Sequence, residues 1–245
     1  MTGLLSASYA AAITNIESER LNNTETGTTG SISLSLDGRI GESDKLALGT
    51  SVKLIRSFSR DELITILSRD YAEVDDVVNT DETFIHLRYL TKHTENWGHE
   101  VFTQYQEDRF NSLARRSLFG GGARYTLNQL PDKKQANHFG MGVFYEEEEY
   151  VDSLNLEDES TIRLNFYWAF RNKLAENLLY TSTLYYQPKA EDFNDTKGIW
   201  QNSVTISVTS TINLSLTWDV ELDTETPTDH DNTVTNYNSV LIYNF

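Results

Sequence analysis

The chain has 245 residues, a formal net charge of -17 and no cysteine. This acidity disfavours binding to nucleic-acid phosphates, and the absence of thiols excludes disulfides and thiolate metal sites. Mean hydropathy is -0.48, and no run of about 18 apolar residues exists to form a transmembrane helix. A transmembrane β-barrel is not excluded, because its strands alternate lipid-facing and lumen-facing side chains.

The N-terminal region carries weak signals. Residues 1–12 lack the basic segment and the apolar core of a secretory signal. We therefore interpret Met1 as a start that replaces a removed signal peptide. A weak strand is expected from about Leu5 to Ile13.

Segments that alternate apolar and polar residues recur along the whole chain, separated by polar or Gly/Asn/Asp-rich breaks, as in antiparallel strands. The expected strands lie at about residues 5–13, 32–40, 46–54, 85–89, 100–106, 119–125, 138–146, 161–171, 178–187, 199–209, 212–223 and 233–245. That makes about twelve, an even number, as in bacterial single-chain barrels. No linker divides them, so residues 1–245 are interpreted as a single barrel domain.

The clearest strand runs from Ile212 to Asp223, where every second residue is apolar. The last strand, from Thr233 to Phe245, places Tyr237, Leu241 and Tyr243 on one face and mostly asparagines on the other. A closing strand with one aromatic face is typical of an outer-membrane barrel. The sequence therefore predicts an all-β, antiparallel up-and-down transmembrane barrel.

The breaks between strands differ in length. Those at 41–44, 93–97, 173–177 and 210–213 are short, and those at 59–81, 147–160, 188–198 and 223–232 are long. Short turns at one end and long loops at the other are the outer-membrane arrangement, with both termini on the periplasmic side. The alternative is a soluble acidic β-sandwich or barrel whose apolar face points inward. We favour the membrane because the apolar face is nearly free of charge over about nine to eleven residues, the length that crosses a bilayer.

Three stretches carry a resemblance to a known family. They are YQEDRF at Tyr105–Phe110, GGGARY at Gly120–Tyr125 and VLIYNF at Val240–Phe245. With these motifs the chain resembles a bacterial family of salt-induced outer-membrane proteins whose activity is not established. The resemblance implies an outer-membrane location and an association with salt, but no reaction.

No catalytic or metal-binding motif accompanies the strands. The histidines His86, His93, His99, His138 and His230 lie outside any nucleophile or zinc motif, and Gly120–Gly122 lacks the lysine of a phosphate loop. The acidic runs at Asp75–Asp76 and Glu146–Glu149 match no calcium loop. We expect no enzyme activity, no cofactor and no specific metal site.

Charged residues on the polar face are the candidate site, because a charge facing lipid at the bilayer midplane costs about 2–4 kcal/mol. The pore-lining candidates are Asp37, Arg39, Lys53, Arg88, Glu100, Arg124, Glu146, Arg163, Asp219 and Glu221. They either line a narrow aqueous path or pair across strands, as Arg88 could with Glu100, and close the lumen.

These observations predict a monomeric outer-membrane barrel, in contact with lipid, that acts as a narrow porin-like channel for ions or small polar solutes. The alternative is a non-conducting barrel, structural or used for docking a partner through its acidic loops.

Overall fold

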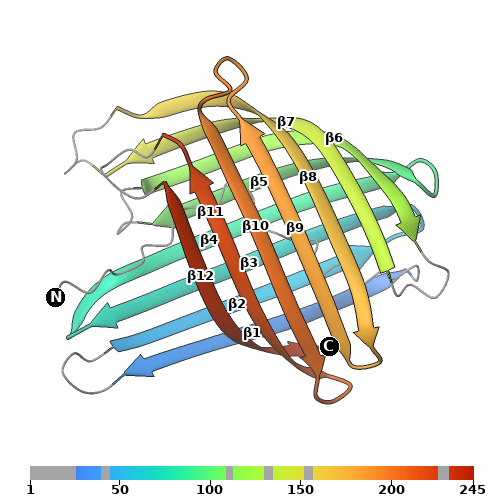
Figure 1. Cartoon of the computed structure of the whole chain (residues 1–245), viewed down its shortest axis with the longest axis horizontal. Coiled ribbons are helices and arrows are strands. Elements are labelled where there is room, and N and C mark those ends of the chain that lie inside the picture. Colours follow the sequence, from blue (N-terminus) through green and yellow to red (C-terminus); the bar gives the residue numbers. More distant parts are fainter. Residues whose placement is uncertain (1–25, 40–44, 109–112, 130–134, 152–156, 226–231) are drawn as a thin grey trace.

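The computed structural model describes residues 26–39, 45–108, 113–129, 135–151, 157–225 and 232–245. The strands are β1 (Gly27–Arg39), β2 (Lys45–Ser57), β3 (Asp61–Val74), β4 (Val77–Lys92), β5 (Trp97–Asp108), β6 (Leu113–Gln129), β7 (Gln135–Tyr150), β8 (Glu159–Ala175), β9 (Leu178–Pro188), β10 (Thr196–Ser207), β11 (Ile212–Asp223) and β12 (Thr233–Asn244). Each strand pairs antiparallel with its sequence neighbours, and β12 pairs with β1 to close the barrel (Figure 1). The predicted all-β up-and-down barrel is confirmed.

The apolar side chains of the alternating segments point outward. On β8 the exposed residues include Ile162, Phe166 and Trp168, whereas Arg163 and Asn165 between them are buried in the interior. The same alternation holds on β12, where Tyr237, Leu241 and Tyr243 are exposed. An exposed apolar band around a closed barrel matches the lipid-facing surface of a membrane barrel. The soluble alternative, with its apolar face inside, is wrong.

The long loop expected from Ser59 to Asp81 is wrong, because these residues form β3 and the start of β4. Val74 pairs with Val77, and both residues between them have positive φ, 51° at Asp75 and 62° at Asp76. Two such residues in succession make the tight hairpin turn that matches strand twist, and aspartate tolerates this conformation. The alternation was hidden because β3 is apolar on both faces, with Ile64 and Ile66 inside and Leu63 and Leu67 outside.

This extra hairpin changes the order of the connections. The described N-terminal residue of β1 and the C-terminal Phe245 lie at one end, and the two backbones bond each other there at Gly30 and Phe245. We call this the terminal end, and the other the loop end. The break at 41–44, expected with the short turns, belongs to the loop end together with 151–158, 189–195 and 224–232.

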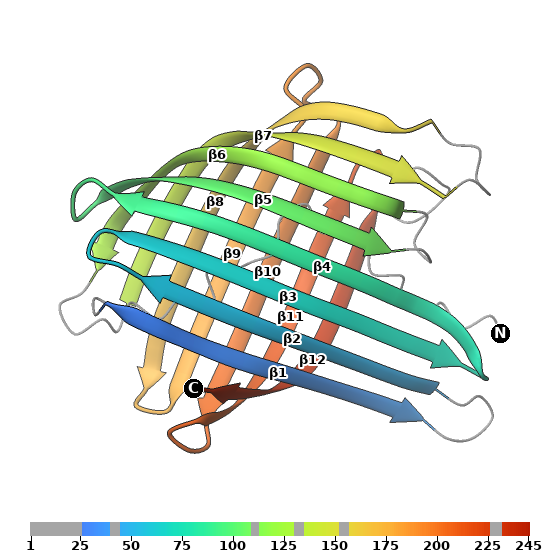
Figure 2. The same ribbon diagram turned by 180° about the vertical axis from the view of Figure 1, so that it is seen from behind.

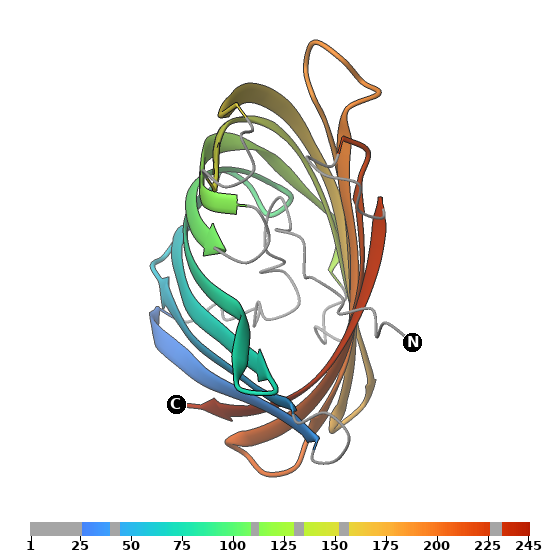
Figure 3. The ribbon, with the colours of Figure 1, turned by 90° about the vertical axis from the view of Figure 1, so that its left-hand side faces the viewer.

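Figure 3 shows that the barrel has an oval cross-section. The strand expected at Leu5–Ile13 lies outside the described residues. Within the described part of the chain, no helix is long and apolar enough to cross a bilayer.

Candidate functional site in the barrel interior

Most of the predicted pore-lining residues project into the barrel. Lys53, Arg88, Glu100, Arg124, Glu146 and Arg163 are buried, and Asp219 and Glu221 are half-buried on the inner face of β11. Asp37 and Arg39 lie on β1, but their side chains are outside the described residues. The structure therefore joins several of these residues into clusters and leaves others apart.

Glu146 is the centre of the largest cluster. Its Oε1 accepts a hydrogen bond from Arg116 Nε at 2.7 Å, and its Oε2 accepts one from Arg163 Nε at 2.6 Å. Arg116 is 0% exposed and Glu146 is 1% exposed, so both charges are shielded from water. Charged groups this deeply buried persist only when they are paired and hydrogen-bonded.

Lys197 closes the cluster from β10. Its Nζ lies 2.5 Å from Glu148 Oε1 and 3.3 Å from Glu146 Oε1. Because β8 and β9 separate β7 from β10, this lysine links strands that share no backbone pairing. We define the ion-pair cluster as Arg116, Glu146, Glu148, Arg163, Asp195 and Lys197.

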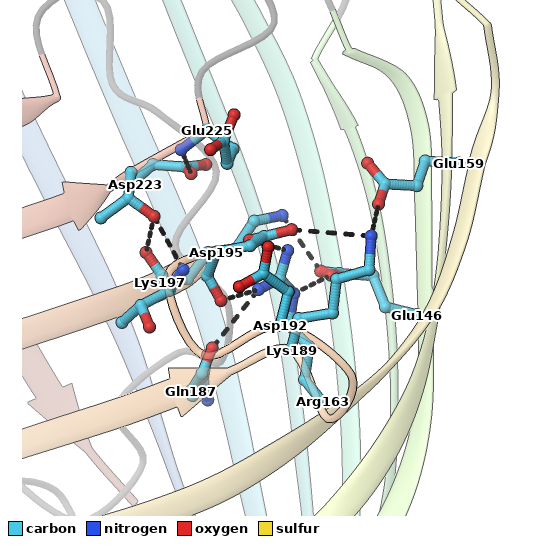
Figure 4. Close-up of polar contacts among 12 residues, drawn as sticks. Glu146, Glu159, Arg163, Gln187, Lys189, Asp192, Asp195, Lys197, Asp223 and Glu225 are labelled. Atoms are coloured by element: carbon cyan, nitrogen blue, oxygen red, sulfur yellow. Dashed lines mark hydrogen bonds and ion pairs between the residues drawn. The ribbon is translucent and has the colours of Figure 1, made fainter.

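The connection between β9 and β10 is bound to the same cluster. Arg163 Nη2 contacts Asp195 Oδ1 at 2.8 Å, and Arg163 Nη1 also donates to the carbonyl oxygens of Gln187 and Asp195 (Figure 4). Beside it, Lys189 donates to Glu159 at 2.8 Å, and this hydrogen bond raises the pKa of the Lys189 ammonium. Ion pairs therefore tie the loop end of β7 and β8 to the start of β10.

A second buried pair lies nearer the terminal end. Arg88 Nη1 donates to Glu100 Oε2 at 3.3 Å across the β4–β5 hairpin, which is the pairing that the sequence allowed. The Arg88 guanidinium also lies 5.3 Å from the centre of the Phe102 ring, a favourable cation–π distance. Arg124 also contacts an aromatic side chain, because its guanidinium donates a hydrogen bond to the Tyr167 hydroxyl at 3.1 Å.

Apolar side chains occupy the inner face between these charged groups. We call them the aromatic layer, made of Phe102, Leu118, Phe144, Tyr167, Ala169, Tyr185 and Ile199. The rings of Tyr167 and Tyr185 lie 5.4 Å apart, and Gly140 leaves the space that the Tyr167 ring fills. The sequence predicted a polar, charge-lined inner face, and this layer shows that part of that face is apolar and buried.

The inner faces of β12 and β1 differ from the aromatic layer and the ion-pair cluster. We define the amide wall as Ser31, Ser33, Ser35, Asn236 and Asn244, all of which are half-buried and uncharged. Asn236 of this wall donates a hydrogen bond to Glu221, on the neighbouring strand β11, at 3.3 Å. These residues are less buried than the charged residues on the side lined by β6–β10, which we call the charged wall.

Sequence reasoning missed four of the six residues of the ion-pair cluster. Arg116 and Glu148 continue the inward parity of Arg124 and Glu146, so strict counting along β6 and β7 would have found them. Asp195 and Lys197 had no such signal, because they lie where a connection becomes a strand.

The comparisons with known proteins agree with this architecture. The translocator domain of autotransporter NalP from Neisseria meningitidis matches with 11% identity and a TM-score of 0.54, over 94% of this chain and 91% of that chain. The NanC porin matches with 12% identity and a TM-score of 0.53, over 88% and 98%. The COG4313 outer membrane channel from Pseudomonas putida F1 matches with 10% identity and a TM-score of 0.55, over 95% and 98%. No curated protein matches the chain.

The fold shared with these barrels, together with the exposed apolar band, defines the class: this protein is a bacterial outer-membrane β-barrel. Residues 32–245 match the family described as "Protein of unknown function, DUF481", and the chain belongs to that family.

Proposed function

We propose that the protein is an outer-membrane channel for ions or small polar solutes, and that its aqueous path follows the amide wall. One observation carries this proposal, the contrast in exposure between the two inner surfaces. Arg116 and Arg163 on the charged wall are buried within ion pairs, whereas Ser31, Ser33 and Asn236 on the amide wall are half-buried. Hydroxyl and amide groups can replace part of the hydration shell of a passing solute without trapping it.

This path differs from the one that the sequence predicted. Glu146 and Arg163 bind each other and their neighbours, so they support the barrel wall instead of contacting the solute. Asp219 and Glu221 are half-buried beside the amide wall and remain pore-lining candidates. The similarity of the fold to a porin and an outer-membrane channel supports a conducting role.

We further propose the orientation and assembly. The connections at the terminal end are short, and the three longest, at 151–158, 189–195 and 224–232, lie at the loop end. By the usual arrangement of such barrels, the terminal end faces the periplasm. One chain closes its own barrel, which supports a monomer surrounded by lipid.

Single-channel recording in planar bilayers tests the channel directly. Replacing Ser33 by Trp should roughly halve the conductance or abolish it, because a large ring would enter the path. Leu34→Trp is the matched control, since Leu34 is on the same strand and is 49% exposed on the outer face. A folded wild-type protein that never conducts, or equal conductance in both variants, contradicts the proposal.

A non-conducting barrel is the second candidate. The aromatic layer and the ion-pair cluster fill part of the interior, which favours a structural or docking role. A folded but silent protein that retains a partner through its acidic loops would support this alternative.

We also propose that the barrel is not an enzyme. A histidine and a hydroxyl do lie close together in the described interior, where His138 Nδ1 is 3.0 Å from Thr126 Oγ1. Turnover of phospholipid or lipopolysaccharide that disappears in Thr126→Ala would contradict this. The family resemblance also implies that expression depends on salt. This stays a prediction, which measurement of the transcript level at low and high salt would test.

A further inference from the structure

Two histidines face each other at the terminal end of the barrel. His99 lies on β5, and His93 directly follows β4, in the turn that connects the two strands. Figure 2 shows this turn at the end of the barrel where the C-terminus lies. Both side chains are exposed, and His99 alternates with the buried Gly98 and Glu100, so it belongs to the outer face. The pair is therefore separate from the interior clusters and open to solvent.

The two rings are close enough to share one atom. His93 Nε2 lies 2.5 Å from His99 Nδ1, and the centres of the rings are 4.6 Å apart. Two nitrogen lone pairs repel each other at this distance, so a positively charged or polarised atom must lie between them. A proton donated by one ring can fill this role. A metal ion fills it too, since neutral imidazole is the commonest protein ligand of transition metals.

The backbone of the β4–β5 hairpin holds the two histidines together. Thr91 lies opposite His99 in the ladder, and the backbone N–H of His93 donates to the carbonyl oxygen of Trp97 at 2.9 Å. Within the turn, the Thr94 hydroxyl accepts a hydrogen bond from the backbone N–H of Trp97 at 3.0 Å. Because the folded hairpin already places both rings, little conformational entropy is lost when one ion binds them together.

The distance between the rings fits a metal ion after a small movement. Bonds between zinc and imidazole are about 2.0–2.1 Å long, and two of them at a tetrahedral angle hold their nitrogens about 3.3 Å apart. The rings of His93 and His99 would therefore separate by less than about 1 Å, which small side-chain rotations allow. In the described part of the chain no group of three or more acidic or imidazole ligands forms, so we expect water to complete the coordination.

The chemistry of two imidazoles selects the class of metal. Imidazole suits Cu²⁺, Ni²⁺ and Zn²⁺, whereas Ca²⁺ and Mg²⁺ prefer oxygen ligands. A chain of net charge -17 attracts any divalent cation to its surface. Preference for Zn²⁺ over Ca²⁺ therefore distinguishes binding at the pair from general attraction to the acidic surface.

We propose that His93 and His99 bind a divalent transition-metal ion, with His93 Nε2 and His99 Nδ1 as its protein ligands. The ion joins the end of β4 to β5, on the face that carries the rings of Trp97 and Tyr125, whose centres are 4.7 Å apart. Aromatic rings of this kind favour the membrane–water interface, where an aqueous ion reaches the site. The sequence predicted no metal site because strand register, and no known zinc motif, brings this pair together. The proposal does not depend on whether the barrel conducts.

Calorimetric titration of the full chain, purified without a histidine tag, tests the site. ZnCl₂ should bind saturably, with one ion per chain. His93→Ala and His99→Ala should each weaken this binding at least about tenfold, because one ring alone lacks its chelating partner. His138→Ala is the matched control, since His138 is half-buried and contacts Thr126, and it should leave binding unchanged.

Several outcomes of the titration would overturn the proposal. Failure of the wild-type chain to bind Zn²⁺ means that the two rings share a proton only. Equal binding of CaCl₂ and ZnCl₂ means that the acidic surface attracts both ions. Binding that persists in both His93→Ala and His99→Ala places the ion elsewhere, and an equal loss in His138→Ala does so as well.

Copper fluorescence quenching locates the bound ion. Trp97 and His99 lie about 7 Å apart along one face of β5, so Cu²⁺ bound to the pair should quench the Trp97 fluorescence strongly. The fluorescence lost on adding one equivalent of Cu²⁺ should fall by more than about half in Trp97→Phe. Trp218→Phe is the matched control, because Trp218 lies on β11. Equal quenching in the two variants would contradict the proposed location.

Discussion

The two inner surfaces of the barrel use polar residues in opposite ways. On the charged wall, Arg116, Glu146 and Arg163 are buried and satisfy one another at short distances. On the amide wall, Ser33 and Asn236 remain half-buried and uncharged. Glu146 and Arg163, which the sequence suggested for the pore, therefore hold the charged wall together, and the proposed path follows the uncharged residues of the amide wall.

Burial explains this division. An ion in a water-filled path is mobile and screened, whereas an ion behind packed rings is held by its partners. The aromatic layer, with Phe144 and Tyr185 about 1% exposed, provides that screen from water on β7 and β9. Substitutions on the charged wall should therefore change stability, and those on the amide wall should change conduction.

The largest expected effect is that of Glu146→Gln. It removes the one carboxylate that contacts Arg116, Arg163 and Lys197, and leaves these buried cations in excess. The barrel should lose about 3–5 kcal/mol of unfolding free energy. Urea unfolding in detergent, followed by tryptophan fluorescence, measures this loss.

Glu147→Gln provides the control for that substitution. Glu147 is the next residue on β7 and has the opposite parity, so it points away from the cluster. Its replacement should shift the unfolding free energy by less than about 0.5 kcal/mol. Equal losses in the two variants would mean that the ion-pair cluster does not stabilise the charged wall.

Gly140→Ala should have the next largest effect. A Cβ at this position would overlap the ring of Tyr167, which would have to move and weaken its hydrogen bond from Arg124. Overpacking of this kind costs about 1–3 kcal/mol. Gly27→Ala is the matched control, because a Cβ at Gly27 has nothing within 4 Å. A thermal melt that does not separate the two variants would show that the aromatic layer is loosely packed.

Thr181→Ala tests a neutral contact on the charged wall. The hydroxyls of Thr181 and Ser203 lie 2.7 Å apart and are buried. Losing this hydrogen bond should cost about 1 kcal/mol. The double variant with Ser203→Ala should cost little more than the single one, and additive losses would instead indicate two independent effects.

The smallest stability effect is expected on the amide wall. Asn236→Ala should change the unfolding free energy by less than about 0.5 kcal/mol, because the hydrogen bond from Asn236 to Glu221 is long, at 3.3 Å. It should nevertheless change single-channel conductance if the path follows this wall. A large loss of stability with unchanged conductance would reverse the roles of the two walls.

Some features could be predicted because they depend on local periodicity. Strands such as 161–171 and 212–223 were correctly assigned to faces, since a period of two fixes which residues share a side. β3 was missed because Ile64 and Ile66 make its inner face as apolar as its outer face. The turn at Asp75–Asp76 was read as part of an acidic loop, although two consecutive aspartates can also adopt the positive φ of a hairpin turn.

The sequence by itself determined that this is a barrel of alternating strands and which stripe of the regularly alternating strands meets lipid. Only the tertiary structure decided which charges meet. Glu146 and Lys197 are 51 residues apart and on strands that do not pair, so their contact depends on the curvature and stagger of the closed sheet. The number of residue pairs between β1 and β12 was also decided by the tertiary structure. Closure of the barrel depends on the geometry of all the strands together and on no single segment.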